Sequence, residues 1–200
     1  MKRVLKHLLW IIPSLIVVAV LCLLAYTAYS RSSEDTYHSS LNNVLQVSSR
    51  DFEPEREMPV QFSCSGEGIS PHIQWTGAPD GTKSFALIAT DWDAPSPGFR
   101  LLQIVHWVLY NIPGDVAEIP QNTTAAALGQ LKITPGLNIA GAPEYAPPCP
   151  PLGQHQYIFR VYALDVEQLQ PDSNTKGGLL RAMQGHILGY GQLIGISSAG

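Results

Sequence analysis

The chain separates into one long apolar run near its start and a series of short apolar stretches divided by polar turns. Lys2, Arg3 and Lys6 precede an uncharged segment whose apolar part extends from Leu8 to Ala28. In a helix, about 20 apolar residues cross a hydrocarbon core of roughly 30 Å. The pattern therefore predicts a basic flank over the first seven residues and a transmembrane anchor over residues 8–28.

A cleaved signal peptide is the alternative explanation of the same run. Small residues at Ala25, Thr27, Ala28 and Ser30 would permit cleavage. The run is longer than the roughly 7 to 15 apolar residues of a secretory signal, which favours an uncleaved anchor. Only Arg31 follows the run closely, so most of the positive charge precedes it. This asymmetry predicts a single-pass membrane protein with a cytoplasmic N-terminus and a periplasmic or extracellular domain.

The rest of the chain predicts a linker and one β-rich domain. Residues 29–44 are rich in serine, asparagine and charge, without apolar periodicity, which is typical of a flexible linker. Residues 45–200 can bury a core without a metal ion or many disulfides. Strands are expected over residues 60–63, 72–75, 84–90, 103–111 and 156–164, and a C-terminal helix is expected from a cap at Asn174 through Leu179, Leu180, Met183 and Ile187. The expected fold class is mainly β, with two antiparallel sheets and the helix packed on one side.

Charge and motifs exclude several functions. Twelve basic and sixteen acidic residues give a net charge of −4, and no basic cluster follows the first seven residues, so nucleic acid is not an expected partner. The sequence has no His-Glu-x-x-His, no Cys-x-x-Cys, no phosphate-cradling glycine loop and no Gly-x-Ser-x-Gly elbow. We therefore expect no cofactor, no metal and no catalytic residues.

Residues able to carry chemistry gather at three places. They are Asp91, Asp93 and Pro95 directly after an apolar strand, His106 inside the next one, and Pro148, His155 and Tyr157 in and after a proline-rich segment. Singly, each has an ordinary structural explanation, because a histidine in a strand is often a core residue and an aspartate after a strand often forms a turn. An oxidising compartment would also allow Cys64 and Cys149 to pair, although two free buried thiols fit the sequence equally well.

The order and spacing of these segments resemble a known family. Five ordered motifs carry the resemblance, from Phe62-Ser63-Cys64-Ser65-Gly66 and Ile69-Ser70-Pro71-His72 through Asp91-Trp92-Asp93-Ala94-Pro95 and His106-Trp107-Val108 to Pro148-Cys149-Pro150-Pro151-Leu152-Gly153-Gln154-His155-Gln156-Tyr157. Between about Val47 and Leu193 the chain is similar to the phosphatidylethanolamine-binding protein family, in particular its bacterial and archaeal branch, often called Raf kinase inhibitor-like.

The resemblance implies a small pocket at one end of two antiparallel sheets, which takes phosphate, acetate or a phospholipid headgroup. Its residues would be Asp91, Asp93, Pro95, His106, Pro148, His155 and Tyr157. This chain departs from the pattern at Gln156, where the family commonly has arginine, and at Pro147, where glycine is common. Loss of that arginine removes a cation that would brace the pocket by pairing with an aspartate.

Three functions compete at this point. The first is non-enzymatic binding of a small anion or phospholipid headgroup. Because the family has members that inhibit kinases and proteases, this function could include control of a protein partner, which the sequence does not identify. The second is a metal-dependent phosphodiester hydrolase using Asp91, Asp93, His106 and His155. The third is a structural envelope protein whose pocket binds nothing.

Overall fold

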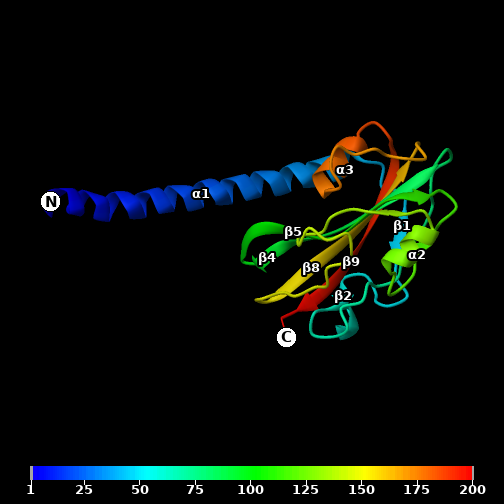
Figure 1. Cartoon of the computed structure of the whole chain (residues 1–200), viewed down its shortest axis with the longest axis horizontal. Helices are drawn as coiled ribbons and strands as arrows, with labels where there is room; N and C mark the ends of the chain where they lie inside the picture. Colours follow the sequence, from blue (N-terminus) through cyan, green and yellow to red (C-terminus); the bar gives the residue numbers. More distant parts are fainter. Residues whose placement is uncertain (1, 200) are drawn as a thin grey trace.

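The computed structural model describes residues 2–199, with side chains from Ile11 onward, and shows two β-sheets packed face to face with one long helix projecting from them (Figure 1). The smaller sheet is antiparallel, in the order β1 (Gln46–Ser48), β3 (Ile73–Thr76), β6 (Glu118–Ile119). The larger has the order β2 (Arg56–Glu57), β9 (Ile187–Ser198), β8 (Gln154–Leu164), β4 (Ser84–Ser96), β5 (Phe99–Pro113), β7 (Thr134–Pro135). All its pairs are antiparallel except β2 with β9. The expected mainly-β fold is confirmed.

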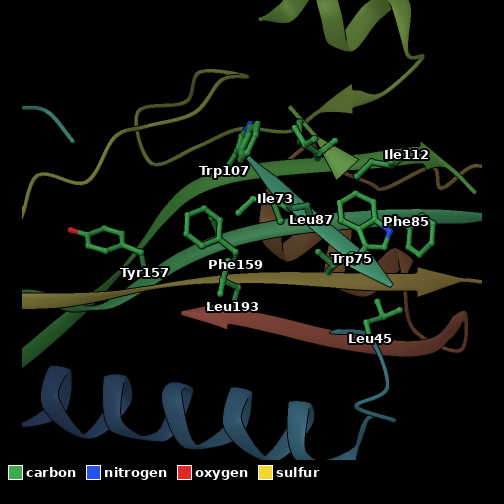
Figure 2. Packing of buried hydrophobic residues seen from close by; sticks show 14 of the residues in the cluster. Leu45, Ile73, Trp75, Phe85, Leu87, Trp107, Ile112, Tyr157, Phe159 and Leu193 are labelled. Carbon is green, nitrogen blue, oxygen red and sulfur yellow. The ribbon is translucent and has the colours of Figure 1, made fainter. Parts of the chain in front are cut away.

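The main core lies between the two sheets, where large side chains from both layers meet (Figure 2). Trp75 of β3 packs against Phe85 of β4 with ring centroids 5.2 Å apart. Alternate residues of β4, Phe85, Leu87 and Ala89, face this core because successive strand side chains point to opposite sides. Burial of these rings and branched side chains supplies most of the driving force for joining the layers.

The opposite face of the larger sheet is also buried. Ala86 and Ile88 of β4 pack there with Tyr162 of β8 and with Leu179 and Met183. The covering elements are α3 (Lys176–Ala182) and the end of α1 (Lys2–Ser40), whereas α2 (Ala125–Gln130) and the short 3₁₀ helix η1 (Val60–Phe62) lie elsewhere in the domain. The uniformly apolar sequence of β4 up to Ala89 therefore reflects a strand covered on both sides.

Two expectations for local structure were wrong. Residues 60–62 form η1 rather than a strand. The C-terminal helix begins after a Thr175 cap, not Asn174, and ends at Ala182, while Ile187 starts the long strand β9. Gly185, with φ of +81°, reverses the chain between the two elements. A side chain at Gly191 of β9 would collide with the Leu45 backbone. Glycine at this position therefore allows the chain at Leu45 to lie close against β9.

The prediction of a flexible linker over residues 29–44 was also wrong for most of that segment, because α1 continues without interruption to Ser40. Glu34 lies against the larger sheet, where it pairs with Arg160 of β8 at 3.1 Å and with Lys176 of α3. His38 Nε2 lies 2.7 Å from the hydroxyl of the buried Tyr162. The polar second half of α1 therefore packs on the domain through polar contacts. Its sequence did not indicate this packing, because it has no apolar periodicity.

Replacing Glu34 by glutamine should destabilise the full chain by about 3 kcal/mol, because Arg160 and Lys176 would keep buried charges without their carboxylate. The measurement is thermal unfolding of the detergent-solubilised protein. Asp35→Asn, one residue along on the exposed side of the helix, is the matched control and should change stability by less than about 0.5 kcal/mol. Equal melting temperatures for the two variants would contradict the packing described for α1.

Candidate functional site

An irregularity in β4 creates the site. β4 pairs with β5 through several register shifts, and one of them separates Asp91, opposite Ile104, from Ala94, opposite Leu102. Such shifts re-aim side chains at the ends of sheets. Here the shift occurs where β4 changes from apolar residues to the Asp91-Trp92-Asp93 segment, so two carboxylates are turned into the end of the sheet sandwich, with 2% and 4% of Asp91 and Asp93 exposed.

A cavity of about 350 Å³ opens beside this irregularity. Of the seven residues expected at the site, five line it: Asp91, Pro95, His106, His155 and Tyr157. Asp93 and Pro148 do not line it and lie just behind it. The remaining walls are apolar or backbone, from Ala94, Leu102, Ile104, Ile139, Ala146, Pro147, Cys149, Pro150 and Pro151.

His155 is held in place by acceptors on both sides of its ring. Its Nδ1 donates to Asp91 Oδ2 at 2.7 Å, and its Nε2 lies 3.3 Å from the carbonyl of Leu152. The side chains of His155 and Asp91 are 1% and 3% exposed, so this hydrogen bond is shielded from water. Both nitrogens of His155 are therefore already occupied, and its role is to fix Asp91 and the floor of the cavity.

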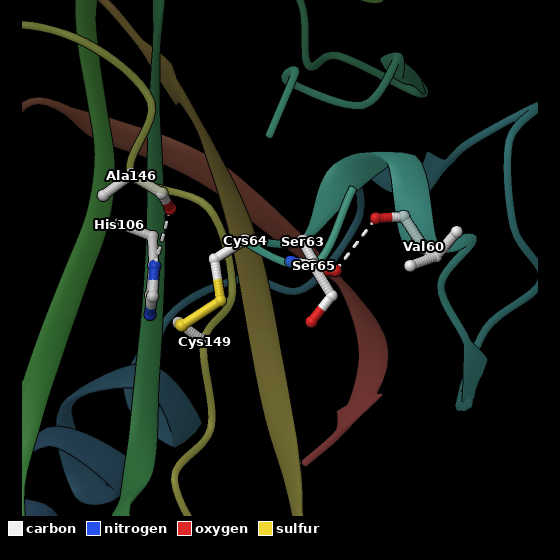
Figure 3. The surroundings of a disulfide bond; sticks show 7 residues. All are labelled: Val60, Ser63, Cys64, Ser65, His106, Ala146 and Cys149. Carbon is white, nitrogen blue, oxygen red and sulfur yellow. Dashed lines mark hydrogen bonds between the residues drawn. A yellow bond between two sulfur atoms is a disulfide. The ribbon is translucent and has the colours of Figure 1, made fainter. Parts of the chain in front are cut away.

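His106 is different, because one of its nitrogens is free. Nδ1 donates to the carbonyl of Ala146 at 2.7 Å, while the buried Nε2 has no hydrogen-bond partner among the described residues (Figure 3). Burial lowers the pKa of His106, and the Ala146 hydrogen bond and the Asp91 carboxylate offset this effect only in part. The ring is therefore neutral near pH 7, and Nε2 is left without a partner beside the cavity that His106 lines.

Asp93 supports the cavity from behind through an arginine that sequence reasoning missed. Its Oδ1 pairs with Arg100 Nε at 2.8 Å, and its Oδ2 accepts from the Gln156 amide at 2.9 Å. The Asp93 amide in turn donates to Asp91 Oδ1 at 2.5 Å. The cation that the resemblance placed at position 156 is thus supplied from β5 by Arg100, which removes the expected loss of bracing.

The proline-rich loop forms the opposite wall and is tied to η1. Cys64 and Cys149 form a disulfide, with Cα atoms 5.3 Å apart (Figure 3). The Cys64 amide also donates to the Pro148 carbonyl at 2.9 Å. Tyr157 packs edge-on against His106 with ring centroids 4.9 Å apart. Burial and the neighbouring Asp91 raise the pKa of Tyr157, so its hydroxyl stays protonated.

Comparison with known proteins identifies the family of the domain. The family model described as phosphatidylethanolamine-binding protein matches residues 48–198, which is most of the chain and all of the cavity. The chain belongs to the phosphatidylethanolamine-binding protein family. The match begins after α1, so the long helix precedes the family domain.

Relatives within the family cover the same portion. A UPF0098 protein of Methanothermobacter thermautotrophicus is 40% identical over 157 residues, covering 78% of this chain and 100% of the relative. The crystal structure of a phosphatidylethanolamine-binding protein homologue from Chlamydia trachomatis is 36% identical, with a TM-score of 0.68, and covers 78% of this chain and 97% of that one. Escherichia coli YbcL, described as a member of the mammalian family, is 26% identical with a TM-score of 0.68, and covers 78% and 99%.

The cavity offers no ready metal site among the side chains that the structure describes. Within residues 11–199 no three His, Cys, Asp or Glu side chains come together as a metal-binding group. Both oxygens of Asp91 and both oxygens of Asp93 already accept hydrogen bonds or pair with a cation. The hydrolase hypothesis needs these carboxylates as ligands, so it has no observation to support it and is not carried further.

Sequence reasoning also missed the apolar side of the pocket. Leu102 and Ile104 come from the start of β5, and Ile139 comes from the loop after β7. Their apolar character was visible in the sequence, but a leucine beside a cavity and a leucine in a core give the same signal. Only the β4–β5 register brings Leu102 and Arg100 next to the Asp91-Trp92-Asp93 segment.

Replacing Arg100 by glutamine should destabilise the domain by about 1–3 kcal/mol, because the buried Asp93 carboxylate would lose its cation. Chemical unfolding measures the change. Adding Gln156→Arg to this variant should recover most of the loss, by returning a cation beside Asp93. Arg181→Gln breaks the exposed pair with Asp172 and is the control, expected to cost less than about 1 kcal/mol. No recovery on adding Gln156→Arg would show that the two positions do not substitute for each other.

Proposed function

We propose that the protein is a non-enzymatic binding module for a small anionic ligand of the phosphate or phosphoethanolamine type, held at a membrane by α1. The observation that carries this proposal is the free Nε2 of His106 at the base of an otherwise satisfied cavity. A buried polar atom without a partner is costly, so a ligand that hydrogen-bonds to it gains what the empty protein lacks.

The groups around the cavity support an anion rather than a cation at this nitrogen. Arg100 neutralises Asp93, and both oxygens of Asp91 accept hydrogen bonds, from His155 and from the Asp93 amide, so neither carboxylate competes with a ligand for Nε2. An anion next to Nε2 would favour protonation of His106, and the ring could then donate to phosphate oxygen. Asp91, at the cavity wall, is placed to attract the ammonium group of a phosphoethanolamine.

The rest of the cavity is suited to recognition and not to reaction. Four prolines, Pro95, Pro147, Pro150 and Pro151, fix the backbone of two of its walls, which lowers the ordering cost of binding. The members of the Asp91–His155 pair are occupied by each other, so neither is free to activate water. A fixed, half-apolar cavity of this size accommodates a headgroup.

Location outside the cytoplasm is part of the proposal. Among the described residues one helix is long and apolar enough to cross a membrane, and it lies near the N-terminus. The Cys64–Cys149 disulfide, at the wall of the pocket, supports an oxidising compartment such as the periplasm or the extracellular space. No surface of the domain identifies a protein partner, so control of a kinase or protease is not included.

Replacing His106 by asparagine should lower the affinity for glycerophosphoethanolamine at least about tenfold, because the amide can retain the hydrogen bond to Ala146 but cannot replace Nε2. Isothermal titration calorimetry on the detergent-solubilised full chain gives the affinity. His186→Asn, which alters a histidine paired with Asp165 outside the pocket, is the control and should bind normally. Equal affinities in both variants would refute the assignment of His106.

The affinity for glycerophosphoethanolamine should rise as the pH falls from about 8 to about 6, with proton uptake on binding. The pKa of His106 is below its ordinary value in the free protein and increases when an anion lies beside Nε2, so binding tightens through the bound-state pKa and levels off below the free-state pKa. A phosphodiester does not titrate in this range, so the change belongs to the protein. Calorimetry in buffers of different ionisation enthalpy counts the protons taken up. If the affinity instead decreased as the pH is lowered, Nε2 would be accepting a hydrogen bond from the ligand's ammonium group.

A further inference from the structure

The end of the domain that carries the pocket lies beside the membrane-proximal part of α1. In Figure 1 the β4–β5 hairpin, the start of β8 and the C-terminus all lie on the side of the domain from which α1 projects. A hollow of about 340 Å³ is bounded by Leu23 and Tyr26 of α1 and by Leu101 and Leu102 of β5. The hairpin therefore extends alongside α1 to the level of Leu23, inside the apolar run that ends at Ala28.

The orientation of the hairpin relative to α1 is fixed by the contacts that replaced the expected linker. Gln103 of β5 donates to Glu34 at 2.9 Å, and Glu34 is itself paired with Arg160 of β8. An α-helix rises 1.5 Å per residue, so Leu23 lies about 16 Å along the helix from Glu34. Since α1 is unbroken between them, the hairpin cannot turn away from the membrane without breaking this buried network.

Exposed apolar side chains surround the mouth of the pocket at the same end. Leu102 and Ile139, 54% and 57% exposed, line the cavity itself. Leu152, 62% exposed, follows the proline-rich wall, and Phe99, 46% exposed, lies at the tip of the hairpin. A cluster of large exposed apolar side chains indicates a site that contacts another apolar surface, of a protein or of a membrane.

The occupant of this surface is identified by α1. The side chains of its apolar part are exposed, including Leu15, Ile16 and Leu21 at 63%, 58% and 59%, and require a hydrocarbon environment. Tyr26 and Tyr29, 68% and 72% exposed and one turn apart, are the residues expected at the headgroup level of a bilayer. Tyr26 borders the same hollow as Leu102, so the mouth of the pocket lies at that level too.

We infer that the β4–β5 hairpin and the loop around Leu152 rest in the interface of the bilayer that α1 spans, and that the ligand is the headgroup of a phospholipid still held in that bilayer. This inference rests on the proposed function and specifies the source of the ligand. The polar base of the pocket, with His106 and Asp91, receives the headgroup, while Leu102 and Ile139 at the mouth contact the glycerol and the first part of the acyl chains.

The position of the hairpin is tested in nanodiscs of phosphatidylethanolamine and phosphatidylglycerol with brominated acyl chains, using the full chain with Trp10→Phe. Phe99→Trp should add fluorescence that the brominated lipids quench at least about twofold. Leu131→Trp, at the end of α2 on the far side of the domain, is the matched control and should add fluorescence that is not quenched. The inference would be overturned if each introduced tryptophan emitted equally in brominated and in ordinary lipid.

The source of the ligand is tested by titrating glycerophosphoethanolamine into the same protein in detergent and in nanodiscs. We expect at least about tenfold weaker apparent binding in nanodiscs, because bilayer lipid already occupies the pocket. Phe99→Gln should recover part of this loss in nanodiscs and leave binding in detergent unchanged, since Phe99 does not line the cavity, whereas Leu131→Gln should change neither. Equal binding in both environments would overturn the lipid source and leave the proposed function standing, whereas no binding in detergent would overturn the proposed function itself.

Discussion

Because β4 and β8 carry apolar side chains on both faces, the six-stranded sheet has to be covered on both sides. The small sheet covers one face, and α3 with the end of α1 covers the other. A buried polar group needs a partner in place of water, so Arg160 of β8 is paired with Glu34 beneath α1, and Asp91 and His155 contact each other at the end of the sandwich. Asp91 lies there directly before the register shift that separates it from Ala94.

The same cost of burial explains how the site is organised. Asp91, Asp93, His155 and Arg100 satisfy one another through short contacts, and such mutual pairing allows the two carboxylates to remain buried. His106 Nε2 is the polar atom lining this pocket that the described residues leave unpaired. Recognition therefore depends on one nitrogen of a histidine whose pKa is lowered by burial, supported by side chains that already have hydrogen-bond or ion-pair partners.

Much of the architecture could be predicted from the sequence, because apolar runs between Gly and Pro turns locate β3, β4, β5 and β8 within a few residues. The site residues Asp91, His106 and His155 were found through the order of their motifs, and no one of them would have been distinguished from a core residue. Arg100 could not be found, since it pairs with Asp93 only through the β4–β5 register. Ile187, the first residue of β9, was assigned to the C-terminal helix because Leu179, Leu180, Met183 and Ile187 share a helical period, which the turn at Gly185 interrupts.

The helical continuation of α1 matters most for how the pocket meets its ligand. A flexible linker of 16 residues would let the domain move over roughly 20–25 Å and face any direction. The buried pairing of Glu34 with Arg160 instead holds one end of the sandwich towards the membrane. A tethered binding site meets its target at effective concentrations on the order of millimolar, but only when both can engage at once. A fixed orientation keeps the pocket and the bilayer in contact at all times. A pocket of modest intrinsic affinity, with one free histidine nitrogen, can then remain occupied by a headgroup of the adjacent bilayer.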